Sequence, residues 1–325
     1  MGICISRASS EIHNAESAGH ENAVLFLEDQ IVSSGTQRLA SVYSKEGSKG
    51  LNQDSAILYQ GYGNPDGTFC GVFDGHGKNG HVVSEMVRNR LPLLLKTDGK
   101  CPPTDDSQKW KEDVVSAFRV MDKEIKLQEN LDCSCSGTTA VVVIRQDEDL
   151  IIANLGDSRA ILGTTTENGL SVVQLTTDLK PGLPSEAERI TNCNGRVLAL
   201  KHEPHIQRVW LPHEDSPGLA MSRSFGDFLL KDHGIIAIPD VSHRRISSED
   251  QFVVLASDGV WDVLSNNQVA SIVWEAESKE AAARAVVEAA TATWRKKFPN
   301  AKIDDCSVVC LFLQKKHANL VPEGT

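Results

Sequence analysis

Short apolar runs separated by turn residues dominate the chain from Leu39 onwards, and their spacing is typical of β-strands. Gly, Asn, Pro and Asp cluster between consecutive runs, which favours short strands joined by tight turns. The four runs between residues 138 and 175 are expected to form an antiparallel meander. The pattern predicts strands at 39–43, 55–59, 69–73, 138–144, 150–155, 160–162, 171–175, 252–257 and 306–313.

Longer segments repeat their apolar residues every three or four positions, as one buried face of an α-helix requires. A shorter helix is expected at 186–190, with Ser185 as a candidate cap of its first turn. Because strands come in two clusters and helices in two pairs, we expect an α+β fold with two packed sheets and helices outside. The longer helices are predicted at 78–95, 110–128, 266–274 and 280–297.

Composition along the chain indicates one folded domain with a tail at each end. Residues 1–36 are rich in Ser, Glu, Asn and His, so we predict a disordered tail in which only Val24–Leu27 could be buried. Residues 37–315 form the domain, and 316–325 a second tail. Between 178 and 218 the periodicity fades, and long irregular stretches in compact domains are usually functional. We interpret residues 178–218 as an insertion that borders the functional site of the domain.

Overall composition narrows the class of protein. Hydrophobic residues make up 40% of the 325, and no run approaches the 18 apolar residues that suggest a transmembrane helix. The formal net charge of −11 argues against a nucleic-acid partner, because phosphate binding needs basic surface. The eight cysteines form no CxxC pair, so we expect reduced thiols in a cytoplasmic protein.

Acidic residues stand at the ends of several predicted strands. Asp74, Asp157 and Asp258 each follow a strand, and Asp304-Asp305 precedes the last one. Turn formation alone would explain any single case, since Asp and Gly favour turns. If the four sites converge, however, the carboxylates repel one another and require a cation. An all-oxygen ligand set indicates Mg²⁺ or Mn²⁺ rather than zinc.

Five motifs occur together in one order along the chain. They are Asp74-Gly-His-Gly77, Gly156-Asp-Ser-Arg-Ala160, Ser224-Phe-Gly-Asp227, Ser257-Asp-Gly-Val-Trp-Asp262 and Asp304-Asp305. In this register they resemble the metal-dependent protein serine/threonine phosphatases of type 2C (the PPM family), with the match running from about Leu39 to Leu313. The Met-Gly-x-Cys start and the Lys49–Asp54 stretch look most like the plant branch.

The resemblance implies a fold and a reaction. The fold would be an αββα sandwich of two antiparallel sheets flanked by helix pairs, with 37–315 as the catalytic domain and 178–218 as a flap that shapes substrate choice. The chain would be a signalling hydrolase that acts on phosphoserine and phosphothreonine in proteins, with two Mg²⁺ or Mn²⁺ ions per site and room for a weaker third. Nothing in the sequence demands more than one copy, so we expect a monomer.

The resemblance also implies a set of metal ligands. Asp74 would bridge the ions and Gly75 would bind through its carbonyl oxygen, while Asp258 and Asp305 would complete the other metal. Asp54 is assigned to the metal centre, directly or through its water shell.

Further residues are implied to support the ions or the substrate. Gln53 would lie in the water shell, and Asp157 with Asp262 would hold the third ion or support the other ligands. His76 would protonate the departing serine or threonine oxygen. Lys49 stands where many members carry a phosphate-gripping Arg, and Lys lacks the bidentate fork of Arg.

Two other departures from the family pattern do not remove a ligand. Gln53 replaces a frequent Glu, and Cys306 follows Asp305 where Asn is common. We therefore expect an active enzyme. The alternatives are a non-catalytic phosphoprotein-binding member of the same fold, and a metal-dependent phosphodiesterase or nuclease, which two-metal chemistry also permits. Trp210 does not match the flap tryptophan of plant relatives that bind hormone receptors, so no such partner is expected.

The first six residues, Met-Gly-Ile-Cys-Ile-Ser, fit the N-myristoylation pattern with Gly2 as acceptor. One acyl chain holds a protein only marginally on a membrane, and Cys4 offers a site for a second, palmitoyl chain. A doubly acylated protein would lie at the inner face of the plasma membrane. Without modification, the segment is a leader of a cytoplasmic protein.

Overall fold

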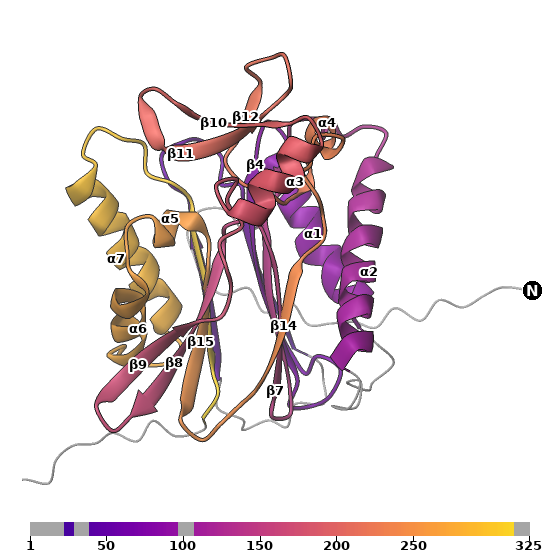
Figure 1. Cartoon of the computed structure of the whole chain (residues 1–325). Coiled ribbons are helices and arrows are strands. Elements are labelled where there is room, and N and C mark those ends of the chain that lie inside the picture. Colours follow the sequence, from indigo (N-terminus) through magenta and orange to yellow (C-terminus); the bar gives the residue numbers. More distant parts are fainter. Residues whose placement is uncertain (1–22, 29–38, 97–106, 315–325) are drawn as a thin grey trace, which may run out of the picture.

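Two β-sheets packed against each other form the centre of the molecule, and helices cover both outer faces (Figure 1). The computed structural model describes residues 23–28, 39–96 and 107–314. The first sheet has the strand order β1-β3-β4-β6-β7-β14, with β5 joining β4 to β13 beside this path. The second sheet has the order β2-β16-β15-β8-β9 and is antiparallel throughout.

The bounds of the strands follow the apolar runs closely. The first sheet consists of β1 (Val24–Glu28), β3 (Asp54–Gln60), β4 (Thr68–His76), β5 (Gly137–Thr138), β6 (Ala140–Gln146), β7 (Asp149–Leu155), β13 (Phe225–Gly226) and β14 (Asp240–Arg245). The second consists of β2 (Ala40–Lys45), β8 (Arg159–Thr166), β9 (Gly169–Gln174), β15 (Asp250–Ala256) and β16 (Cys306–Phe312).

Two pairs of long helices cover the sheets. The pair on the first sheet is α1 (Gly80–Leu94) and α2 (Ser107–Lys126), and the pair on the second is α6 (Asn266–Trp274) and α7 (Ala282–Lys297). Short helices α4 (Phe228–Lys231) and α5 (Asp258–Trp261) lie near the upper end of the sandwich in Figure 1. The predicted α+β sandwich is therefore confirmed, although β1 pairs with β3 in parallel.

Alternation along the strands explains why the layers pack. On β4, Phe69 and Phe73 pack beneath the helices, whereas Cys70 and Val72 face the second sheet. Successive side chains of a strand point to opposite faces, so a strand between two apolar layers must be apolar on both. This arrangement buries a cluster of residues between the helices and each sheet, and a third cluster between the sheets.

The predicted meander is wrong in one respect. Strands β6 and β7 pair in the first sheet, but β8 and β9 pair in the second, so the chain crosses between the sheets after Leu155. Short turns join all four strands. Strands β6, β7 and β8 are mostly buried, whereas β9 is half-buried or exposed. A row of short strands joined by short turns does not record which sheet each strand joins.

Two predicted boundaries also need correction. Residues 24–28 form β1, which extends the first sheet, so the predicted tail 1–36 is wrong in that stretch; residues 1–22 and 29–38 lie outside the described ranges. The stretch 178–218 is more ordered than predicted. It forms α3 (Pro184–Asn192) and a separate sheet of β10 (Arg196–Leu200), β11 (Glu203–Trp210) and β12 (Pro217–Leu219). Helix α3 is capped by Leu183 without a side-chain hydrogen bond, not by Ser185.

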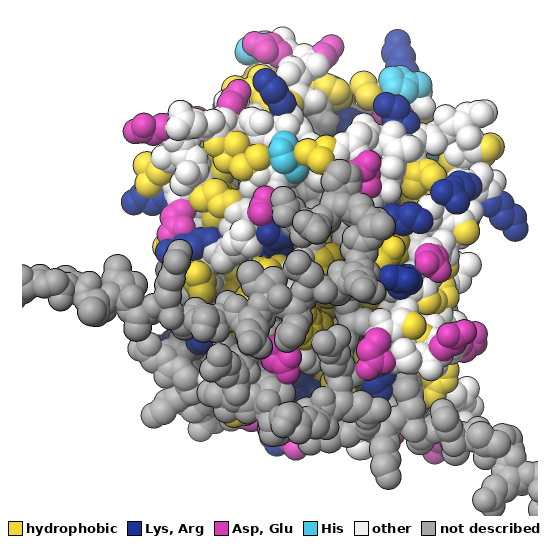
Figure 2. Space-filling view, turned by 180° about the vertical axis from the view of Figure 1, so that it is seen from behind, with side chains coloured by type: hydrophobic (Ala, Val, Ile, Leu, Met, Phe, Trp, Pro, Cys, Tyr) yellow, Lys and Arg dark blue, Asp and Glu magenta, His cyan; other side chains and the backbone are white. Residues whose placement is uncertain are grey.

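Charged side chains of both signs occur on one face of the described part. Figure 2 shows Lys, Arg, Asp and Glu interspersed on the face opposite to the view of Figure 1, where it is not grey. Within the described ranges, no helix is both long enough and apolar enough to cross a membrane.

Candidate active site

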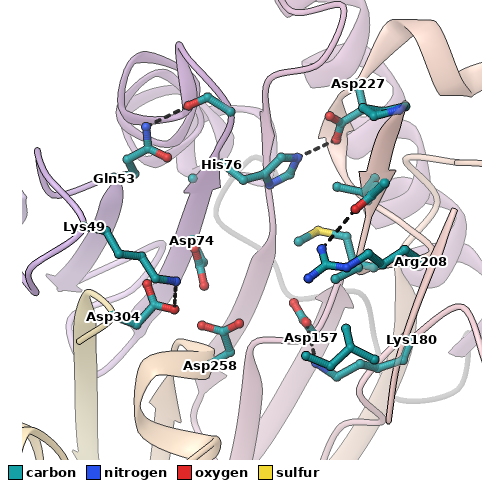
Figure 3. Close-up of a pocket in the computed structure, with 18 of the residues that line it drawn as sticks. Lys49, Gln53, Asp74, His76, Asp157, Lys180, Arg208, Asp227, Asp258 and Asp304 are labelled. Carbon is teal, nitrogen blue, oxygen red and sulfur yellow. Dashed lines mark hydrogen bonds and ion pairs between the residues drawn. The ribbon is translucent and has the colours of Figure 1, made fainter. Parts of the chain in front are cut away.

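A cavity of about 1040 Å³ is lined on one side by residues of β11 and β12 and on the other by the acidic ends of the sandwich strands. Its walls come from segments far apart in the chain (Figure 3). Most of the predicted site residues line it: Lys49, Gln53, Asp74, Gly75, His76, Asp157, Asp258, Asp262 and Asp305. Asp54 is the predicted residue of the described ranges that is absent from this lining. Gly2 and Cys4 lie outside those ranges.

The end of β4 supplies Asp74 and His76 to the cavity. Sequence analysis placed the end of this strand before Asp74, but β4 continues to His76 because Gly75 and His76 pair with β5. Residues i and i+2 of a strand point to the same side, so the longer strand directs both side chains into the cavity. The chain then turns at Gly77, whose φ of 80° is in the left-handed region.

Three carboxylates, Asp74, Asp258 and Asp304, point toward a common region in Figure 3. Burial raises the pKa of Asp74 well above its usual value, and Asp258 is the strongest of the neighbouring charges that raise it further. Burial likewise raises the pKa of Asp258, together with Asp157 and Asp304. Like charges in a buried site are costly unless a cation neutralises them. The donors present therefore fit a divalent cation with oxygen ligands.

The geometry also indicates which kind of ion fits. Within the described residues, no three His, Cys, Asp or Glu side chains converge on one point as a metal cage. Mg²⁺ usually keeps several waters and takes only one or two carboxylates from the protein. Carboxylate and carbonyl oxygens, which are the donors available here, are therefore compatible with hydrated Mg²⁺ or Mn²⁺.

The two adjacent carboxylates Asp304 and Asp305 have different surroundings. Asp305 Oδ1 accepts a hydrogen bond from Gly47 N at 2.8 Å, and its Oδ2 accepts one from Gln53 N at 2.8 Å. Asp304 instead pairs with Lys49 and raises the pKa of both Asp74 and Asp258. Asp305 thus fastens the neighbouring loop, and Asp304 faces the carboxylate cluster.

Asp54 lies behind the cavity wall, opposite Asp74 in the register of β3 and β4. Its side chain is 3% exposed, and Oδ2 accepts a hydrogen bond from Ser257 Oγ at 2.7 Å. Burial and the charge of Asp305 raise its pKa to about 7. Gln53, next to it, reaches the rim and donates from Nε2 to Gly77 O at 2.8 Å.

A lysine stands at the position assigned to the third ion. Lys180 Nζ donates to Asp157 Oδ2 at 2.6 Å, while Asp157 Oδ1 is buried without a hydrogen-bond partner in the described part of the chain. Asp262 lines the same region, and its pKa is raised by burial and by Asp157, against the lowering effect of Lys180. The Lys180 ammonium thus neutralises part of the negative charge of Asp157 and Asp262.

His76 is hydrogen-bonded to a carboxylate that sequence analysis quoted in a motif but gave no role. His76 Nε2 and Asp227 Oδ2 are 2.7 Å apart, and Asp227 is 2% exposed. Burial alone would lower the pKa of His76, but the charge and hydrogen bond of Asp227 reverse this, and the pKa is raised overall. The structure therefore adds Lys180, Asp227 and Asp304 to the candidate residues of the active site.

Comparisons with known proteins agree on one family. The family model described as protein phosphatase 2C matches residues 40–297. "Probable protein phosphatase 2C 72" of Arabidopsis thaliana is 54% identical over 97% of this chain and 99% of its own length. "Probable protein phosphatase 2C 64" of Oryza sativa subsp. japonica is 47% identical over 97% of this chain and 78% of its own.

A solved structure extends the likeness to the backbone. The crystal structure of a serine-threonine phosphatase 2C from Toxoplasma gondii superposes with a TM-score of 0.74 at 27% identity. The superposition covers 84% of this chain and 94% of that one.

Proposed function

This chain belongs to the protein phosphatase 2C family, and we propose on that basis which residues of the cavity carry its reaction. The chain is a metal-dependent phosphatase that removes phosphate from phosphoserine and phosphothreonine in proteins. The observation that supports placing the reaction in this cavity is the pair Asp74 and Asp258, buried carboxylates that need a cation beside them.

Asp74, the carbonyl oxygen of Gly75, Asp258 and Asp304 would hold two Mg²⁺ or Mn²⁺ ions. Asp304 takes the place of the predicted Asp305, because both oxygens of Asp305 already accept backbone hydrogen bonds. When bound, these ions would supply an activated water and neutralise phosphoryl charge. Asp54 would support the ligands from behind the wall, and it is not proposed as a direct ligand.

The remaining polar groups of the cavity would act on the phosphate ester. His76 would donate a proton to the leaving serine or threonine oxygen. The Lys49 side chain is 53% exposed and pairs with Asp304. Its ammonium group would also bind the phosphate of the substrate. Gln53 would orient water at the rim, and Asp157 and Asp262 would hold a third ion only in competition with Lys180.

No observation in the described residues favours the non-catalytic alternative. The carboxylates proposed as ligands, Asp74, Asp258 and Asp304, line one cavity together with His76. The nuclease alternative is also disfavoured, because the formal net charge of −11 opposes binding of a nucleic acid, whose phosphates need basic surface. We also propose that the protein acts as a monomer, as the sequence led us to expect.

The test is turnover of a phosphoserine peptide by the purified full chain. We expect activity with Mn²⁺ or Mg²⁺ and its loss on exhaustive chelation. Asp74→Asn and Asp258→Asn should nearly abolish turnover and leave the fold intact by circular dichroism. Asp232→Asn, an exposed residue outside the cavity, is the matched control. Full activity after chelation, or near-normal rates in both site variants, would overturn the assignment.

We propose in addition that the N-terminus carries two acyl chains, myristoyl on Gly2 and palmitoyl on Cys4. The support is the sequence pattern alone. A single myristoyl chain binds membranes only with an affinity of about 10⁴ M⁻¹, so the second chain would make attachment stable. The enzyme would then work at the inner face of the plasma membrane.

A further inference from the structure

His76 and Asp227 come from segments that are 151 residues apart in sequence, and a short strand lies between them. His76 on β4 pairs with Gly137 on β5, and Gly137 pairs on its other side with Gly226 on β13. Asp227 follows directly after β13. The ladder of β4, β5 and β13 therefore determines that these two side chains meet.

Gly137 has no side chain, and this leaves room for the hydrogen bond between His76 and Asp227. A Cβ at this position would lie 2.6 Å from Asp227 Oδ2 and 3.0 Å from His76 Nε2. It would also lie 2.2 Å from the backbone oxygen of Phe225. Any side chain at position 137 would collide with the two hydrogen-bonded atoms. The contact between His76 and Asp227 therefore requires glycine at this position.

Several hydrogen bonds fix the position of Asp227. Its φ of 51° is unusual for a residue with a side chain, and its N–H donates to Ser136 O at 3.0 Å. Ser224 Oγ donates to the same Oδ2 at 2.5 Å. Lys231 Nζ donates to Ser224 O at 2.7 Å, and Gly226 N donates to Asp122 Oδ1 of α2 at 2.9 Å. Helix α2 thus helps to fix the turn that carries Asp227.

The other nitrogen of the ring has no partner. His76 Nδ1 is buried and makes no hydrogen bond to the described residues. Buried polar atoms without partners are rare in folded proteins and call for an explanation. Because an ionised carboxylate only accepts, Asp227 requires the proton on Nε2. The His76 side chain lines the cavity and is 20% exposed, so Nδ1 is the nitrogen left for a group that a bound substrate brings against the ring.

We propose that Asp227 is the positioning residue of His76, fixing its ring and its Nε2 proton so that Nδ1 donates to the leaving oxygen. The inference rests on the proposed role of His76 as the acid. As water oxygen bonds to phosphorus, the bond from phosphorus to the serine or threonine oxygen breaks, and its electron pair stays on that oxygen. The oxygen takes the Nδ1 proton, and the neutral ring keeps its proton on Nε2, donated to Asp227.

The first test compares two leaving groups. A serine or threonine alkoxide needs protonation, whereas an aryl oxide leaves without it. We expect Asp227→Asn to slow a phosphoserine peptide by about 10- to 100-fold, the usual loss for a partner that orients a histidine. An aryl phosphate should lose much less. Ser224→Ala, which removes a smaller support, should show a weaker loss with the same selectivity, and Asp232→Asn should match the wild type.

A double variant separates positioning from a merely structural role. If Asp227 acts through His76, Asp227→Asn should add no more than about a twofold loss in a His76→Ala background. A selective readout that does not depend on turnover is the ¹⁵N spectrum of the histidine rings. In the wild type the neutral His76 ring should carry its proton on Nε2, with the signal assigned by its absence in His76→Ala. Asp227→Asn should shift the neutral ring toward the Nδ1-protonated form.

The outcomes distinguish the inference from the proposed function. If His76→Ala slows both substrates equally, the acid role itself fails. If His76→Ala is selective for the alkyl ester but Asp227→Asn and Ser224→Ala slow both substrates equally, only the positioning role is overturned. Fully additive losses in the double variant, or an unchanged ring proton in Asp227→Asn, would also overturn it.

Discussion

The Lys180 ammonium donates a hydrogen bond to Asp157 Oδ2 at 2.6 Å, at the place where the sequence predicts a third metal ion. The charges of Asp258 and Asp262 also raise the pKa of this lysine, although burial acts in the opposite direction. A side chain of the protein therefore competes for the carboxylates that a third ion would use. The occupancy of that ion should depend on Lys180.

Lys180→Met should increase the affinity for a further Mn²⁺ ion, because Asp157 then loses its cation and keeps its negative charge in a buried site. Titration with Mn²⁺ followed by electron paramagnetic resonance would count the bound ions. Lys201→Met, an exposed residue outside the cavity, is the control. The same number and affinity of ions in Lys180→Met and the wild type would contradict the competition.

Asp304→Asn should mainly weaken metal binding, whereas Asp305→Asn should mainly lower the stability of the fold. Asp304→Asn should weaken Mn²⁺ binding by about tenfold or more, at least the loss seen for residues that only support a ligand. Asp305→Asn should lower the free energy of unfolding by about 1–3 kcal/mol, because an amide cannot accept from both Gly47 N and Gln53 N. Calorimetric metal titration and urea unfolding would separate the two effects. A reversed pattern would restore Asp305 as the ligand.

Lys49→Ala should raise KM more than it lowers kcat if the ammonium binds phosphate in the ground state. Lys49→Arg should keep KM near or below that of the wild type, because a guanidinium retains the charge and adds the bidentate fork. Steady-state kinetics with a phosphopeptide would measure both. Unchanged parameters in Lys49→Ala would mean that Lys49 serves only its ion pair with Asp304.

Glu186 of α3 should make the stability depend on pH under acidic conditions. Burial would raise its pKa, but hydrogen bonds from Arg223, Arg189 and Ser222 lower it to about 2, below the ordinary 4.5. A carboxyl with a lowered folded-state pKa gives stability that is present above its unfolded pKa. That stability is lost as pH falls from about 4.5 through about 2.

Urea unfolding between about pH 6 and pH 3 would test this linkage. The advantage of the wild type over Glu186→Gln should shrink as pH falls through this window. Glu188→Gln, at an exposed position of the same helix, should show a constant difference from the wild type. An advantage over Glu186→Gln that does not change with pH would contradict the lowered pKa.

Acylation should control where the protein is found without changing its catalysis. We expect the wild type expressed in plant cells to partition to membranes, Cys4→Ser to be partly soluble, and Gly2→Ala to be fully soluble. Turnover of a soluble phosphopeptide should be equal in all three. If the wild type and Gly2→Ala fractionate identically, neither acyl chain anchors the protein.

The sequence by itself determined the layers of the fold and the identity of the family. Apolar periodicity placed α6 at Asn266–Trp274 and β15 within two residues of its observed start, because the exposed and buried faces of an element are encoded locally. The order of the Asp-containing motifs indicated the family, and the comparisons confirm it. Those motifs, together with the Lys49–Asp54 stretch, also identified nine of the residues that line the cavity.

Tertiary structure alone decided the partners of the charged side chains. Asp304 and Asp305 are chemically identical neighbours, and only the loop at Gly47 and Gln53 determines which of them is withdrawn from the cavity. The extension of β4 to His76 depends on pairing with a two-residue strand, too short to leave a periodic signal. Contacts such as Lys180 with Asp157 and His76 with Asp227 depend on how distant segments pack, and no local pattern of polarity records that packing.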